Sequence, residues 1–84
     1  MRLDKFLKVS RLIKRRTVAN EACDTSRITV NGKISKASYN VKVGDLIGVT
    51  FGTRSIVVRV LEIKETTKKS ESQGMYEIIS ETDA

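Results

Sequence analysis

The hydrophobic period of the sequence changes at Arg27, and this change limits the folds that are open to the chain. Before it, Leu3, Phe6 and Leu7 fall at positions i, i+3 and i+4, which is the spacing of one helical face. After it, apolar and polar residues alternate over residues 28–30, which is the period of a strand with one buried face. The sequence therefore predicts helices first and strands afterwards.

The first predicted helix covers residues 2–9 and is apolar on one face and basic on another. Asp4 lies in its first turn, where a carboxylate suits the positive end of the helix dipole. A connection of high positive charge follows over residues 10–16. Leu12 and Ile13 interrupt its charges, and we expect them to hold the connection against the core.

A second short helix is predicted after this connection. Thr17 is expected to be its N-cap, because a threonine hydroxyl can accept a hydrogen bond from a free amide of the first turn. The helix is expected to end near residues 24–26. Its predicted apolar stripe consists of Val18, Ala19, Ala22 and Cys23.

A β-hairpin is predicted at Asn31-Gly32, because both residues tolerate the positive φ of a type I′ turn. The stretch 65–74 is polar and predicts a mobile loop, and the acidic end of the chain is expected to fray. Further strands are predicted over residues 46–51, 55–64 and 75–79.

The order of these elements predicts the α+β class, with two short N-terminal helices packed on a mainly antiparallel sheet of four to five strands. The chain has 84 residues and a mass of 9.4 kDa, which suits one small domain with a thin core. A core of this size leaves no room for a deep cofactor pocket or for a catalytic cleft between domains.

The composition excludes several kinds of chemistry. There is no histidine, so no histidine general base is available, and the lone Cys23 excludes an internal disulfide. We expect Cys23 to be a small buried hydrophobe. The sequence predicts no catalytic residue, no cofactor and no metal site. It contains no apolar run of the ~18 residues that a membrane span needs and no secretory signal, so we expect a cytoplasmic protein with no membrane partner.

The positive charge is concentrated in the first half of the chain. Residues 1–45 carry 11 basic and 4 acidic side chains, whereas residues 46–84 carry 5 basic and 6 acidic side chains. Such clustering is typical of a protein that binds a polyanion. Seven cations lie in the first sixteen residues, with only Asp4 opposing them: Arg2, Lys5, Lys8, Arg11, Lys14, Arg15 and Arg16.

Three physical features favour a nucleic-acid backbone as the partner of this cluster. The cations repel one another unless an anion binds. The cluster leads into a helix N-terminus, where amides and the dipole favour a phosphate. Arginine can also hold a phosphate with two parallel hydrogen bonds. Aromatic residues make up only 5% of the chain, and Phe6 and Phe51 are expected in the core, so structured RNA fits better than stacked single strands.

An ordered set of short motifs resembles the RNA-binding domain of small-subunit ribosomal protein four, the S-four domain. The resemblance covers about residues 1–50 and implies an L-shaped motif of two helices and a hairpin that docks on structured RNA. We therefore expect an S-four-like RNA-binding domain over residues 1–64, followed over 65–84 by the polar loop, a possible last strand and an acidic tail. The motifs are Arg2-Leu3-Asp4-Lys5-Phe6-Leu7, Ser10-Arg11, Arg16-Thr17-Val18-Ala19, Ile28-Thr29-Val30-Asn31-Gly32 and Lys42-Val43-Gly44-Asp45.

The resemblance also implies which residues face RNA. Asp4 matches an acidic position of the family, and we expect it to orient a neighbouring arginine. Ser26 stands where the family commonly has glycine, so it must adopt a left-handed conformation or end the helix differently. The expected contacts are Arg2, Lys5, Arg11, Arg15 and Arg16, with Lys14, Lys33 and Lys36 at the periphery, and the basic face of the first helix adds Lys8.

Among stand-alone members, the chain is similar to the small bacterial heat-shock S-four protein and, more closely, to the RqcP type of ribosome-associated quality control. The heat-shock type has a long basic C-terminal extension, whereas this C-terminus is short and acidic. The resemblance implies docking on rRNA of a large ribosomal subunit that still holds peptidyl-tRNA. It further implies cooperation with the RqcH-type factor that adds a C-terminal alanine tail, with the chain acting as a non-enzymatic monomer.

Other functions stay open at this point. One is a general heat-shock or ribosome-assembly protein that binds structured RNA. Another is a nucleoid or DNA-binding protein, although no predicted helix is both long and basic enough to read a major groove. A fragment of an RNA-modifying enzyme would need a catalytic domain that this sequence does not contain.

Overall fold

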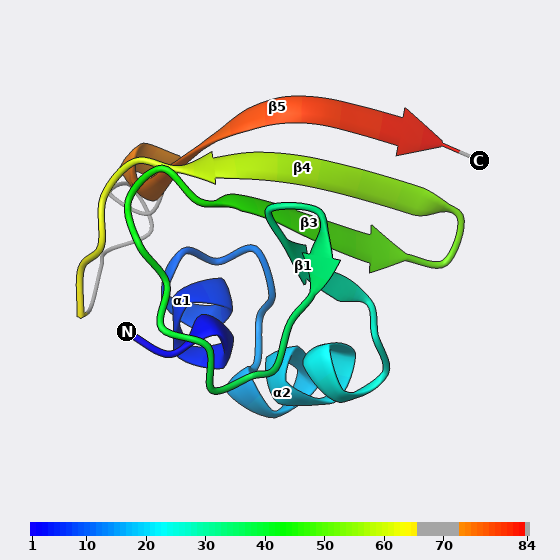
Figure 1. Cartoon of the computed structure of the whole chain (residues 1–84), viewed down its shortest axis with the longest axis horizontal. Helices are drawn as coiled ribbons and strands as arrows, with labels where there is room; N and C mark the ends of the chain where they lie inside the picture. The colour runs from blue at the N-terminus through cyan, green and yellow to red at the C-terminus, as the bar shows by residue number, and fades with distance from the viewer. Residues whose placement is uncertain (66–72, 84) are drawn as a thin grey trace.

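The computed structural model describes residues 1–65 and 73–83 and contains two helices followed by a five-stranded sheet (Figure 1). The predicted order of helices and strands is confirmed. The elements are α1 (Leu3–Val9), α2 (Arg16–Asp24), β1 (Ile28–Val30), β2 (Lys33–Ile34), β3 (Leu46–Phe51), β4 (Arg54–Val60), the 3₁₀ helix η1 (Gln73–Met75) and β5 (Tyr76–Asp83).

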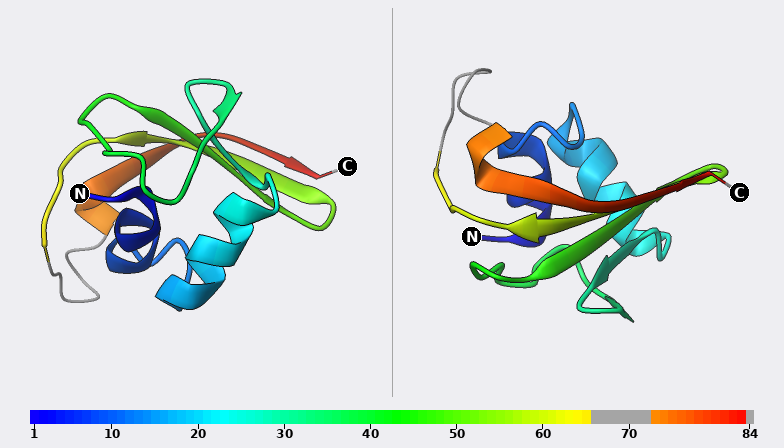
Figure 2. Two further views of the ribbon diagram at one scale, coloured as in Figure 1. Left: turned by 60° about the horizontal axis from the view of Figure 1, so that its bottom comes forward. Right: turned by 90° about the horizontal axis from the view of Figure 1, so that it is seen from above.

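The sheet is antiparallel throughout and has the strand order β2-β1-β3-β4-β5. Both helices lie on the same side of it (Figure 2). The predicted α+β class is therefore confirmed. Asn31 and Gly32 join β1 to β2 with φ angles of 52° and 84°, so the predicted tight hairpin forms at this pair.

The core lies between the helices and the covered face of the sheet. The side chains of Leu3, Phe6 and Leu7 from α1 are fully buried against residues such as Ile47 and Val58. These contacts fix α1, and with it the cations of the first turn, on the scaffold. The second helix contributes Ala19, Ala22 and Cys23, and the connection is held by buried Ile13 and half-buried Leu12, as predicted.

Two residues that the sequence places in the core lie outside it. Val18 is 42% exposed, because the buried face of α2 is set by Ala19 and by the residues three and four positions later. Phe51 is 43% exposed, because it is the last residue of β3 and lies at the end of the strand. Both expectations were wrong.

The ends of α2 also differ in part from the prediction. The helix begins at Arg16, with the backbone of Arg15 extended at the N-cap position, so Thr17 lies inside the first turn and caps nothing. At the other end Ser26 adopts a left-handed φ of 61°. Its N–H donates to the carbonyl of Cys23 at 3.2 Å, and the next N–H donates to Ala22 at 2.9 Å, which is a Schellman motif.

The last two strands have other bounds than predicted. β4 ends at Val60, because β3 begins at Leu46 and offers no earlier residue to pair with. The N–H of Val60 donates to the carbonyl of Asp45 at 2.9 Å. β5 extends through the acidic end to Asp83, because β4 supplies pairing partners as far as Arg54, with one irregularity in the register between Val57 and Val58. The predicted loop over 65–74 lies mostly outside the described residues, and Gln73–Met75 form η1.

Candidate nucleic-acid interface

The nine predicted RNA-facing cations lie on three parts of the chain. The N-terminal part, with α1, carries Arg2, Lys5 and Lys8; the connection and the start of α2 carry Arg11, Lys14, Arg15 and Arg16; the β1–β2 hairpin and the residues after it carry Lys33 and Lys36. Lys5 is half-buried, and the other eight are exposed. The structure thus presents these side chains to solvent, and their contact with RNA stays a prediction.

Asp4 brings together two arginines that are far apart in the sequence. Its carboxylate is only 4% exposed. The Nε and Nη2 atoms of Arg2 donate to its Oδ1 and Oδ2 atoms at 3.2 and 3.3 Å. The Nη2 atom of Arg16, at the start of α2, lies 3.5 Å from Oδ1. One buried carboxylate therefore holds a guanidinium from each end of the basic stretch.

Two further donors complete the environment of this carboxylate. The backbone N–H of Lys5 donates to Oδ1 at 2.8 Å, and Nδ2 of Asn20 donates to Oδ2 at 3.3 Å. Burial by itself raises the pKa of Asp4, but the hydrogen bonds from Asn20, Arg2 and Lys5 and the charge of Arg16 outweigh it and lower the pKa below its usual value. Asp4 is therefore ionised at neutral pH.

Sequence reasoning missed Asn20, although a signal for it existed. Asn20 lies four residues after Arg16, which places both side chains on one face of α2. Together with Asp4 and Thr17 they line a shallow hollow of ≈400 Å³ between the two helices. The signal was this spacing, because a buried carboxylate on α1 needs hydrogen-bond donors and Asn20 presents one on the same face of α2 as Arg16.

The arginines are held by Asp4 without being neutralised by it. One carboxylate is shared by two guanidiniums, so the group keeps a net positive charge. The side chains of Arg2 and Arg16 remain 51% and 48% exposed. A guanidinium has five N–H donors, and Arg2 uses two of them on Asp4. Within the part of the chain that the structure describes, the remaining donors of both side chains are available to a phosphate.

The five other cations of the first sixteen residues fall into two groups. Lys5 forms an ion pair with Glu65, which comes from the segment after β4. Within residues 1–65 and 73–83, no carboxylate lies within ion-pair distance of Lys8, Arg11, Lys14 or Arg15. Among the described residues, the charges of Arg11, Lys14 and Arg15 in the basic connection therefore have no ion-pair partner.

Arg11 has an unusual backbone conformation within that connection. Its φ is 65°, a left-handed value that L-residues other than glycine and asparagine rarely adopt. It directly follows Ser10, the C-cap of α1, and its N–H donates to the carbonyl of Lys8 at 3.1 Å. A glycine would satisfy this geometry with less strain, so the choice of arginine favours a role for its side chain.

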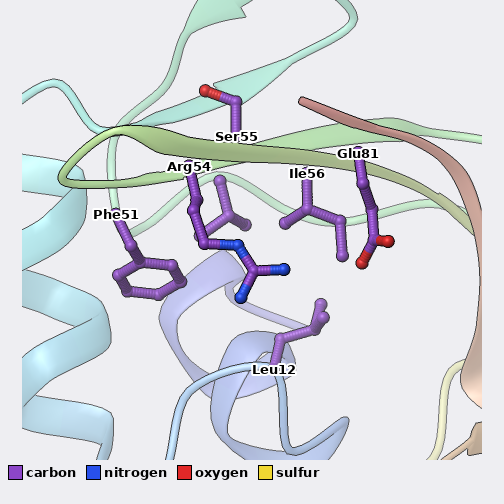
Figure 3. A pocket seen from close by; sticks show the side chains of 7 residues that line it. Leu12, Phe51, Arg54, Ser55, Ile56 and Glu81 are labelled. Carbon is purple, nitrogen blue, oxygen red and sulfur yellow. The ribbon is translucent and has the colours of Figure 1, made fainter. Parts of the chain in front are cut away.

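A hollow of ≈290 Å³ opens between the connection and the ends of β3 and β4 (Figure 3). Its walls are mostly apolar, and the ring of Phe51 and the side chain of Leu12 point toward it. None of the nine predicted cations lines it. This hollow therefore lies apart from the predicted RNA-facing cations. No helix among the described residues is long and apolar enough to cross a membrane.

Comparisons with known proteins agree with this geometry. The family model of the S4 domain, named the S-four domain above, matches residues 1–47. The chain is 58% identical over 82 residues to the "RQC P-site tRNA stabilizing factor" of Streptococcus pneumoniae, covering 98% of this chain and 93% of that protein. It is also 58% identical over 81 residues to the Bacillus subtilis protein of the same name, with 96% and 94% covered.

Among solved structures, the chain is similar to Vibrio cholerae Heat Shock Protein 15, whose structure is described as trimeric. The TM-score is 0.89 at 26% sequence identity, with 95% of this chain and 82% of that chain covered. The fold seen here is thus the fold of that protein. The chain belongs to the S4-domain family and, within it, to the family of RQC P-site tRNA stabilizing factors.

Proposed function

We propose that this chain is a non-enzymatic RNA-binding factor that stabilises the P-site tRNA on the large ribosomal subunit in ribosome-associated quality control. The observation that carries the proposal is the buried Asp4 carboxylate, which holds exposed guanidiniums from two segments in fixed positions. Close relatives named as P-site tRNA stabilizing factors support the choice of RNA.

The proposed mechanism is electrostatic docking on a phosphate backbone. Arg2 and Arg16 are held in place before the RNA arrives, so less side-chain entropy is lost on binding. The first amides of α2 have no side-chain cap, and a helix N-terminus of this kind favours a phosphate oxygen. Selectivity then comes from the shape of folded, A-form RNA, because phosphate contacts carry no base information.

The finer parts of the proposal follow from the family. We propose that the chain contacts both rRNA of the large subunit and a peptidyl-tRNA that has been left there after a stalled ribosome splits. In that position it would support C-terminal alanine tailing by the RqcH-type factor. We further propose that it acts as a monomer in the cytoplasm.

Co-sedimentation with purified large subunits that carry a P-site tRNA tests the proposal. If about five to seven cations neutralise phosphates, the logarithm of the association constant should fall against the logarithm of salt concentration with a slope of about −4 to −6. A slope near zero would remove the phosphate mechanism. Tighter binding to duplex DNA than to subunits, at one salt concentration, would favour a nucleoid protein instead.

A second candidate is a general structured-RNA-binding protein of the heat-shock type. The structural similarity to Heat Shock Protein 15 favours it. Subunits with and without a P-site tRNA distinguish the two functions. Tighter binding to the tRNA-carrying subunit supports the quality-control role, whereas equal binding supports the general one.

A further inference from the structure

We propose that Asp45 is a positioning residue for RNA binding, which fixes the β1–β2 hairpin so that Lys33 and Lys36 face the RNA in a constant orientation relative to Arg2. The inference rests on the RNA-binding function proposed above. The positioning residue Asp45 and its partners Asn31 and Tyr39 are not among the cations that the sequence assigned to the interface.

Asp45 is a nearly buried acid that has three neutral partners. It is 8% exposed and directly precedes β3. Its Oδ2 atom accepts hydrogen bonds from the hydroxyl of Tyr39 at 2.8 Å and from the N–H of Lys42 at 2.9 Å. Its Oδ1 atom accepts from Nδ2 of Asn31 at 3.2 Å. The carboxylate thus joins three separate points of the chain.

One of these points is the hairpin turn itself. Asn31 is the first residue of the turn, and besides its bond to Asp45 it makes two more bonds to Leu46. Its own N–H donates to the Leu46 carbonyl at 2.7 Å, and its Oδ1 accepts from the Leu46 N–H at 3.0 Å. β2 contains only two residues, and so short a strand fixes little by itself. The bonds of Asn31 to Asp45 and Leu46 therefore add to the pairing of β1 with β3 and hold the turn end of the hairpin in place.

A second point is the link between β2 and β3, which runs beside α1 (Figure 1). Tyr39 is half-buried in this link, and its carbonyl accepts a hydrogen bond from the N–H of Leu3 at 2.8 Å. Its neighbour Asn40 pairs with the backbone of Arg2. Asp45 therefore connects the hairpin, through Tyr39, to the segment that carries Arg2.

The ionised state of the Asp45 carboxylate strengthens the hydrogen bonds that hold the hairpin in place. Burial raises the pKa of Asp45, but the hydrogen bonds from Lys42, Tyr39 and Asn31 and the charge of Lys42 lower it below its usual value. Hydrogen bonds to an ionised acceptor are stronger than neutral ones. An amide at this position has one acceptor oxygen, and its NH₂ would face a donor. Asp45→Asn therefore disrupts the set of three hydrogen bonds while it keeps the volume of the side chain.

Two variants test the inference, with large subunits carrying a P-site tRNA as the probe. Asp45→Asn and Tyr39→Phe should each weaken binding by about three- to tenfold and make the salt slope shallower by about 1 to 2, because two cations lose their phosphates. The tyrosinate absorbance of Tyr39 should also shift to lower pH in Asp45→Asn, because the hydroxyl loses its negatively charged acceptor. Tyr76→Phe, which changes a half-buried tyrosine of β5, is the matched control and should behave as wild type.

A double-mutant cycle separates positioning from simple loss of stability. Lys33→Ala/Lys36→Ala should weaken the wild-type chain but change little in the Asp45→Asn background. Equal losses in both backgrounds, or an unchanged salt slope in Asp45→Asn and Tyr39→Phe, would overturn the inference. If Asp45→Asn does not fold, the milder Tyr39→Phe decides. If the wild-type chain itself fails to bind subunits, it is the proposed function that is wrong.

Discussion

Arg16 begins α2 and Asp4 lies in the first turn of α1, yet the Nη2 atom of the arginine lies 3.5 Å from the Oδ1 atom of the acid. Arg2 shares the same carboxylate, with its Nε atom 3.2 Å from Oδ1. The acid and the two cations therefore act as one unit. Loss of the acid should therefore affect both cations together.

Asp4→Asn distinguishes positioning from bulk charge. The substitution raises the net charge by one, so a purely electrostatic interface should bind RNA more tightly. If Asp4 holds Arg2 and Arg16 in place, binding should weaken by about three- to tenfold because ordering the freed side chains then costs entropy. Binding to tRNA-carrying large subunits at two salt concentrations measures the effect. Tighter binding at both would mean that the carboxylate has no positioning role.

Arg16→Ala and Arg2→Ala should each weaken association with large subunits without unfolding the chain. Each should make the salt slope shallower by about 0.7 to 0.9, the value for one phosphate contact. Arg59→Ala is the matched control, because Arg59 pairs with Glu77 at 2.8 Å on exposed strands and its removal changes the net charge equally. Equal effects of all three substitutions would argue against a localised interface.

Arg11→Gly should increase stability and decrease RNA binding at the same time. Glycine adopts the φ of 65° without the clash that a Cβ atom causes, so we expect a gain of about 0.5 to 1 kcal/mol in the free energy of unfolding. Ser26→Gly makes the same backbone change at a φ of 61° and removes no cation. It should stabilise the chain and leave subunit binding unchanged. Denaturant unfolding and co-sedimentation of both variants check the contrast.

Leu7→Ala should lower the stability of the fold without removing a residue of the candidate interface. The side chain is fully buried in the core between α1 and the sheet, so its truncation should lower the free energy of unfolding by about 2 to 5 kcal/mol. Ile34→Ala is the control, since Ile34 is 66% exposed and its truncation removes little buried surface. Urea unfolding followed by circular dichroism measures both. Comparable losses in the two variants would contradict the assigned core.

Stability should decrease on acidification because of Asp4 and Asp45. Both carboxyls have a lowered pKa in the folded chain, so at acidic pH the unfolded chain binds more protons than the folded one. The two carboxyls contribute fully to the free energy of unfolding above the ordinary aspartate pKa of about 3.9. This contribution is lost as the pH falls through their lowered pKa values in the folded chain. Asp45→Asn should therefore lose less stability than the wild type between about pH 5 and pH 2 in urea unfolding experiments. An identical pH dependence would exclude Asp45 as a contributor.

Local features of the sequence were sufficient for much of the fold. The helical spacing of Leu3, Phe6 and Leu7 placed α1 and its buried face, and the Asn31-Gly32 pair placed the hairpin. These predictions succeeded because each depends on residues within a few positions of one another. Val18 was assigned wrongly, because it follows the hydrophobic pattern of α2 but lies about 100° away from the neighbouring Ala19 on the helix.

The sequence proposed which cations face RNA, which stays a prediction, but it did not show how the fold arranges them. The charge pattern identified the cations from Arg2 to Arg16, and Asp4 was expected to orient an arginine. The carboxylate of Asp4 binds two guanidiniums and the amide of Asn20. This arrangement could not be predicted, because it depends on how α1 packs on α2. The extent of β5 similarly required a partner strand, because its acidic end has no hydrophobic pattern that predicts a strand.

The sequence by itself determined the order of the elements, the hairpin turn and the concentration of positive charge near the N-terminus, because these depend on the residue types of short segments. Only the tertiary structure decided which donors surround the two buried acids. Asp4 and Asp45 take partners from segments up to 16 residues away, and such partners become neighbours only when the segments pack together. A hydrogen bond is effective over about 3 Å, so the periodicity of a sequence cannot specify it.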